Sequence, residues 1–250
     1  SAIGTVVAQW GMAAACIAIA VRHARREGAS IRPALPGVAA AARAGGWMLL
    51  RTVTLRIALV ATTVAATGLG TVTLASTQVL FQLTFLFALA LDAFAIAAQA
   101  MIGFDLGAGT HAEVRATVRR LVGWGLASGI VLGAMLAALA PWLGRVFSSD
   151  AGVIEAVPVG AWVVAATMPL GAVVFVLDGV LIGAADGRYL ALAGLVNLAV
   201  YLPLLWWAAQ VPDASGAPAA VLAIQLAYCV GFYGIRALTL GVRALGSRWM

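Results

Sequence analysis

The chain has 250 residues, of which 64% are hydrophobic and 10% are charged, and its mean hydropathy is +1.05. A soluble domain needs a charged surface and does not reach such values, so this composition excludes a soluble enzyme, a nucleic-acid-binding module and a secreted disulfide scaffold. The net charge of +6 comes from arginines beside apolar stretches, a pattern typical of membrane topology, and we therefore expect an all-α, polytopic helical membrane protein.

The first predicted membrane span covers residues 2–21. A basic segment follows it, which contains Arg22, Arg25, Arg26 and Arg32. Because arginine-rich loops stay in the cytoplasm, this segment predicts that the first span ends on the cytoplasmic side. The connector over residues 33–45 is Ala-rich, contains prolines and is too short to cross a bilayer, so we predict a surface helix that lies along the lipid headgroups.

The start of the chain differs from that of a complete membrane protein. Ser1 is not an initiator methionine, and an apolar span begins almost at once. The basic start and small-residue cleavage site of a signal peptide do not precede it. We therefore expect a fragment that lacks its N-terminal part.

The second and third predicted spans, residues 47–67 and 77–109, carry charges among apolar residues. The second contains Arg51 and Arg56, and one face of the third contains Gln78, Gln82, Asp92 and Gln99 at helical spacing. A carboxylate in the bilayer interior costs a few kcal/mol, so Asp92 should face a partner or a water-filled cavity. The amides have a second interpretation, because such groups also join neighbouring helices by hydrogen bonds.

The remaining four predicted spans cover residues 121–143, 157–184, 189–209 and 217–240. Gly125, Gly129 and Gly133 lie four residues apart in the first of these, which predicts the close approach of another helix. Asp178 lies about two turns before the end of the next span. Further polar candidates are Asn197, Tyr201, Gln225 and Tyr228, although most such residues form hydrogen bonds between helices.

Depth within the spans predicts two ion pairs. Arg56 and Asp92 lie about 15 and 18 Å from the inner ends of their spans, and Arg51 and Asp178 both lie about 7 Å from theirs. Pairing lowers the cost of burying each charge. Two interpretations stay open: the pairs only hold the helices together, or substrate or proton competes for the carboxylate, so that protonation of Asp92 weakens its bond to Arg56 and favours a helix rearrangement.

Three stretches resemble a known family. They are LDAFAIAAQAMIGFDLGAGT (91–110), VRRLVGWG (118–125) and FVLDGVLIGAADGRYLAL (175–192). They are similar to the second half of multidrug and toxic compound extrusion (MATE) transporters, in particular the damage-inducible F-type branch. The resemblance implies two six-helix lobes that face alternately inward and outward and exchange protons or sodium for cationic, amphipathic drugs.

On this resemblance, residues 1–22 are the last transmembrane helix of an N-terminal lobe. Residues 23–46 are the cytoplasmic link between the lobes, and residues 47–250 are the six-helix C-terminal lobe. In the F-type branch a carboxylate of the N-terminal lobe is thought central to proton coupling, and this chain has no counterpart of it.

The function expected from these features is that of a fragment of a secondary active antiporter. A lipid-linked oligosaccharide flippase of the same superfamily and a non-transporting membrane scaffold are the alternatives. A retinal protein needs a Schiff-base lysine, which the chain lacks. No set of nucleophile, base or metal ligands is visible, so we do not expect an enzyme.

The expected substrate and ion pathway consists of Asp92, Arg56, Gln82, Gln99, Asp178, Arg51, Asn197 and Tyr201. We expect no cofactor, and the coupling ion is a proton or sodium. The expected partners are a small organic substrate, the lipid bilayer and the missing N-terminal lobe, but no nucleic acid. The expected location is the plasma membrane, in which the protein is multi-pass.

Overall fold

The computed structural model describes residues 2–26, 28, 35–109, 111–211, 215–246 and 249. Its elements are α1 (Ala2–Arg26), α2 (Leu35–Gly68), α3 (Thr71–Gly107), α4 (His111–Phe147), α5 (Ala151–Gly183), α6 (Gly187–Ala208), α7 (Gly216–Leu226), the π-helical turn η2 (Ala227–Phe232) and α8 (Tyr233–Leu245). Among the described residues, seven helical stretches are long and apolar enough to cross a membrane, with α7, η2 and α8 together forming the last. The predicted all-α membrane fold is confirmed.

The chain divides into two compact units, residues 1–43 and 44–250. Helix α2 begins at Leu35, so residues 35–46 continue directly into the second span and do not form the separate surface helix predicted from the sequence. The adjacent Gly45 and Gly46 do not end this helix. Each glycine costs about 1 kcal/mol relative to alanine, which the flanking alanines and apolar residues outweigh.

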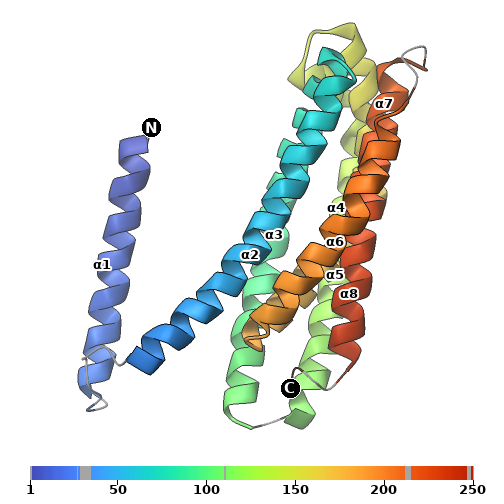
Figure 1. The fold of residues 1–250 in the computed structure, drawn as a ribbon. Coiled ribbons are helices and arrows are strands. Elements are labelled where there is room, and N and C mark those ends of the chain that lie inside the picture. The colour runs from blue at the N-terminus through green and yellow to red at the C-terminus, as the bar shows by residue number, and fades with distance from the viewer. Residues whose placement is uncertain are drawn as a thin grey trace. The chain divides into compact units, whose positions relative to one another are not determined.

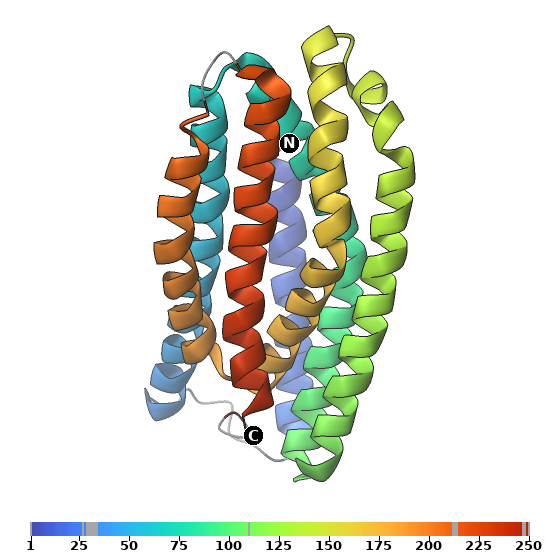
Figure 2. The ribbon, with the colours of Figure 1, turned by 90° about the vertical axis from the view of Figure 1, so that its right-hand side faces the viewer.

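The helices of residues 44–250 lie side by side in alternating directions (Figure 1). Helix α6 lies beside α2, and α4 lies beside α5, with α7, η2 and α8 between these pairs (Figure 2). The turn between α2 and α3 consists only of Leu69 and Gly70, and the φ of 105° at Gly70 is one that glycine adopts without strain. The opposite end of the bundle carries Arg188 and Arg243 and is called the Arg-rich end below.

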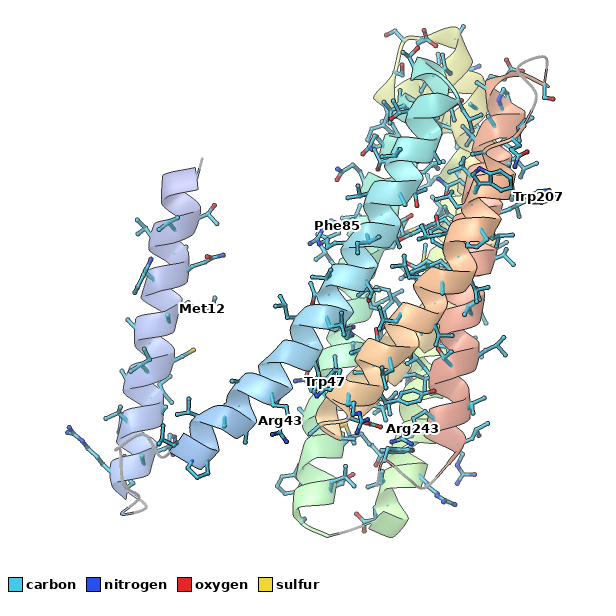
Figure 3. The ribbon with its side chains drawn as sticks, viewed as in Figure 1. Met12, Arg43, Trp47, Phe85, Trp207 and Arg243 are labelled. Carbon is cyan, nitrogen blue, oxygen red and sulfur yellow. The ribbon has the colours of Figure 1, made fainter. Side chains whose placement is uncertain are left out.

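Large apolar side chains cover the outside of this bundle. Phe85 on α3 and Trp207 on α6 are both exposed and point away from the neighbouring helices (Figure 3). A soluble protein rarely leaves such a continuous apolar surface in water. The side of the bundle that carries Trp207 therefore suits contact with lipid chains.

The glycines of α4 allow this helix to pack closely on α5, as the sequence predicted. A Cβ atom added at Gly129 would lie 2.8 Å from the Cβ of Ala172 and 2.8 Å from the Cα of Pro169. Real Cβ atoms do not approach other atoms this closely, and Pro169 contributes rigid backbone. The contact between α4 and α5 thus depends on the missing side chain at Gly129.

We expect the substitution Gly129→Ala to lower the thermal unfolding midpoint in detergent by several degrees. Overpacking costs about 1–3 kcal/mol, which exceeds the gain of about 1 kcal/mol in helix propensity. Gly123→Ala on the same helix is the matched control, because nothing lies within 4 Å of a Cβ at Gly123. The control should keep or slightly raise the midpoint, and equal effects of the two substitutions would contradict the close packing.

Candidate functional site

Three charged residues from three helices meet inside residues 44–250, and we call them the charge cluster: Arg51 of α2, Asp178 of α5 and Arg236 of α8. Arg51 Nη2 donates a hydrogen bond to Asp178 Oδ2 at 2.8 Å. Arg236 Nη2 donates to Oδ1 at 2.7 Å and to Oδ2 at 2.9 Å of the same carboxylate. Charge-assisted bonds of this length are among the stronger ones in proteins. The cluster therefore ties α2, α5 and α8 together.

The sequence around Arg51 directs its side chain into the bundle. Thr54, Ala58 and Thr62 are buried, and they lie on the same side of α2 as Arg51 at steps of three, seven and eleven residues. Thr62 Oγ1 lies 2.6 Å from the hydroxyl of Tyr201 and joins α2 to α6 by a buried hydrogen bond. This face of α2 is thus fixed against the neighbouring helices.

Asp178 is surrounded by other helices because α5 packs against helices on several sides. A Cβ added at the next residue, Gly179, would overlap the backbone carbonyl of Ala95 on α3. On α8, Arg236 is only 2% exposed, and Leu240 one turn later is fully buried. The carboxylate and the second guanidinium therefore meet where water and lipid are largely excluded.

Two N–H groups of the charge cluster have no hydrogen-bond partner among the described residues. They are Nη1 of Arg236 and Nε of Arg51, and both nitrogen atoms are buried. A buried donor without a partner costs about 1–3 kcal/mol, and more when it is charged. The cluster is therefore incompletely satisfied.

The pair of Arg51 and Asp178 predicted from the sequence is present. Arg236 was missed, because it lies inside the seventh apolar span, where only amides and tyrosines were weighed. The positive charge of Arg236 could have revealed it in the sequence, since an arginine within a membrane span needs a partner. Asp178 was the partner to test at a similar depth.

The second predicted pair, between Arg56 and Asp92, is absent: no salt bridge joins these two described residues. The prediction failed because the depths of Arg56 and Asp92 were counted from predicted helix ends, and the helices extend beyond those ends. Counted from their shared turn at residues 69–70, Asp92 lies about nine residues, or about 13 Å, farther along α3 than Arg56 lies along α2. The charges that act on Asp92 are instead those of Arg51 and Asp178.

An exposed polar face lies along α2 and α3, and we define it by Arg56, Gln82, Asp92 and Gln99, all of which are exposed. Within the part of the chain that the structure describes, their side chains form no hydrogen bond or salt bridge. The two helices adjoin at the end of this face near their shared turn, because Gln78 Nε2 of α3 donates to Thr63 Oγ1 of α2 at 3.4 Å. At bilayer depth such groups must face water or another polar surface, since lipid chains cannot solvate them.

Two predicted pathway residues lie elsewhere. Asn197 and Tyr201 on α6 are fully buried inside the bundle and do not reach the exposed polar face. The Tyr201 hydroxyl is bonded to Thr62, and its ring packs edge-on against Phe232 at 5.4 Å between centroids. Neither side chain contributes to the surface of the bundle in this conformation.

Comparison with known proteins identifies relatives. A model of the MatE family matches residues 48–207. Protein DETOXIFICATION 42 of Arabidopsis thaliana is 32% identical over 156 residues, which are 62% of this chain and 30% of that protein. Protein DETOXIFICATION 44, chloroplastic, of the same plant is 30% identical over 149 residues, 60% of this chain and 29% of that protein. The chain thus matches less than a third of the length of these relatives.

A solved structure has the same fold. It is a MOP superfamily transporter from Pyrococcus furiosus, with a TM-score of 0.65 and 18% sequence identity, and the match covers 82% of this chain and 42% of that one. At this identity the likeness concerns the fold alone. It agrees with the helical bundle described above.

Proposed function

Because the chain belongs to the MatE family, we propose that it is the C-terminal half of a secondary active transporter of the F-type branch, which exports toxic organic compounds, often cationic, across the plasma membrane. The coupling ion in this proposal is a proton or sodium that moves in the opposite direction. The partner in this proposal is an N-terminal lobe of the same protein.

The exposed polar face is the observation that carries this proposal. It holds a carboxylate and three other polar side chains along α2 and α3, and the other helices of residues 44–250 do not cover it. Exposed Phe85 lies between Gln82 and Asp92 on the same side of α3, so the face is amphipathic. Its charged and amide groups still need water or another polar surface at bilayer depth. A water-filled cavity between two lobes supplies the environment that these groups need.

In this proposal Asp92 is the residue for which the coupling ion and a cationic substrate compete. It is exposed and makes no salt bridge among the described residues, so its carboxylate is free to receive a ligand. Protonation removes its charge and thereby releases a bound cation, whereas deprotonation restores the site. Occupancy by one ligand excludes the other, which is the condition for exchange.

The experiment that tests the proposal is dye efflux from cells that express the complete coding sequence, with external sodium and pH varied independently. We expect efflux above that of the empty vector, and its rate should depend on one of the two ion gradients. Efflux that equals the vector control under every ion condition, for cationic and neutral dyes alike, would contradict the proposed transport and favour a scaffold.

A further inference from the structure

The charge cluster contains more positive than negative charge. Arg51 and Arg236 each carry one positive charge and share the single negative charge of Asp178, so one positive charge remains. Arg236 is 2% exposed, and water cannot solvate it. A surplus charge inside a membrane protein is costly unless a counter-charge lies next to it.

The cluster also retains the donors that an anion needs. Arg236 Nη1 and Arg51 Nε are buried and have no partner among the described residues. Both are N–H groups of guanidinium ions, which bond anions more strongly than neutral acceptors. The surplus charge and the free donors are therefore on the same two side chains.

A third free donor lies in the same layer of the bundle. Asn197 is fully buried, and both its Nδ2 donor and its Oδ1 acceptor have no partner among the described residues. The ring of Tyr201, four residues later on α6, packs against Phe232, which lies four residues before Arg236. Because α6 and α8 run in opposite directions, Asn197 and Arg236 both lie one turn from this contact toward the Arg-rich end.

A small cavity lies about one helical turn from the cluster along α5 and α8, and the cluster residues themselves do not line it. A cavity of about 20 Å³ is lined by Phe175, Tyr233 and Leu91, among others. Phe175 lies three residues before Asp178, and Tyr233 lies three residues before Arg236. Leu91 directly precedes Asp92. A cavity of this size holds one water-sized group. The side chain of Arg51 is 18% exposed, which connects the cluster to the surface.

The other carboxylate near the cluster does not occupy the free donors. Asp92 acts on Arg51 through space, but it is exposed and forms no salt bridge with it. It reduces the surplus charge at a distance and leaves the N–H groups open. From these observations we propose that the charge cluster binds one small monovalent anion, a halide or the carboxylate of a small organic acid, which accepts hydrogen bonds from Arg236 and Arg51.

The test uses the protein purified in detergent from its complete coding sequence. The thermal unfolding midpoint is followed by tryptophan fluorescence while chloride, or acetate in a second series, replaces a bulky sulfonate at constant ionic strength. We expect a saturable rise of several degrees, because a ligand that binds only the folded state stabilises it. Saturation with chloride alone identifies a halide site, and saturation with acetate alone identifies a carboxylate site. The absence of a saturable rise in both series overturns the proposal.

Two variants of the cluster should change the anion affinity in opposite directions. Arg51→Gln removes the surplus charge but keeps the bonds between Arg236 and Asp178, so the half-saturating concentration should rise at least about tenfold. Asp178→Asn raises the surplus to two charges, so this concentration should fall, and the anion should restore any lost stability.

Arg145→Gln is the matched control, since Arg145 is exposed at the far end of α4. It should leave the half-saturating concentration unchanged. An unchanged half-saturating concentration for Arg51→Gln overturns the proposal. This test remains valid even if Asp178→Asn does not fold. The outcome is independent of transport: a protein that exports dyes without a saturable anion effect disproves only the anion site, and the reverse result disproves only the proposed transport.

Discussion

The substitution Asp178→Leu is expected to cause a severe loss of folded protein, because it leaves two guanidinium groups without their shared partner. Removing one member of a buried ion pair costs about 3–5 kcal/mol, and here the two remaining charges also repel each other. Arg236 is the more affected of the two, since it is 2% exposed. The measurement is the yield of monodisperse protein in size-exclusion chromatography, together with its thermal unfolding midpoint.

The arrangement of the charge cluster also predicts how substitutions combine. Arg236→Leu alone should cost less than Asp178→Leu, because Arg51 still pairs with the carboxylate. The double substitution should recover part of the loss of Asp178→Leu, as contacting residues do. Asp186→Leu is the matched control: its 2.7 Å pair with Arg243 lies at the Arg-rich end (Figure 3). Breaking it leaves one guanidinium, itself 22% exposed, without its partner, so this variant should lose less folded protein than Asp178→Leu. Strictly additive losses would mean that the cluster does not act as a unit.

The substitution Asp92→Asn is expected to abolish most ion-driven efflux while leaving yield and thermal midpoint near those of the unmodified protein. Asp92 is exposed and forms no salt bridge among the described residues, so the amide costs little stability. The amide keeps the volume of the side chain but cannot carry its charge or exchange a proton. We expect at least a tenfold lower initial rate of dye efflux, about 1.4 kcal/mol in activation free energy.

The matched control for this prediction is Glu155→Gln. It also converts an exposed carboxylate to an amide, but near the end of α5 that lies opposite the Arg-rich end. This variant should transport as well as the unmodified protein. Normal efflux by Asp92→Asn would make Asp92 a structural residue and would require the ion route to lie outside the described helices.

Much of this fold could be predicted from composition and length, because apolar runs of this length have few alternatives to membrane helices. The spacing of Gly125, Gly129 and Gly133 predicted the close approach of another helix, since small residues one turn apart form a groove, and the structure identifies that helix as α5. The helix ends were harder. Flanking alanines extend α2 to Leu35, and hydropathy alone does not mark that boundary.

The candidate site was predictable only in part, because the helix ends were uncertain. Arg51 and Asp178 were paired correctly, but Arg56 and Asp92 were not, because an error of several residues in a helix end becomes an error of about 10 Å in depth. Burial was also not visible in the sequence. Asn197 and Asp92 are both polar residues in apolar helices, yet the first is enclosed by the bundle and the second is exposed.

The central claim is that the exposed polar face of α2 and α3 lines a water-filled route, and the reactivity of single cysteines tests it most directly. The free cysteines, Cys16 and Cys229, are first replaced in the complete protein. Gln82→Cys and Gln99→Cys place a thiol on this face, whereas Val131→Cys places one on the exposed apolar side of α4 that lies opposite its contact with α5.

A charged, membrane-impermeant thiol reagent is then applied to intact membranes and to inverted vesicles. The account predicts that Gln82→Cys and Gln99→Cys react from at least one side, because thiols react as thiolates in water. It also predicts that Val131→Cys, in contact with lipid, does not react. If the cysteines at 82 and 99 are unreactive from both sides, or if the cysteine at 131 reacts equally fast, the face does not line an aqueous route and the account is wrong.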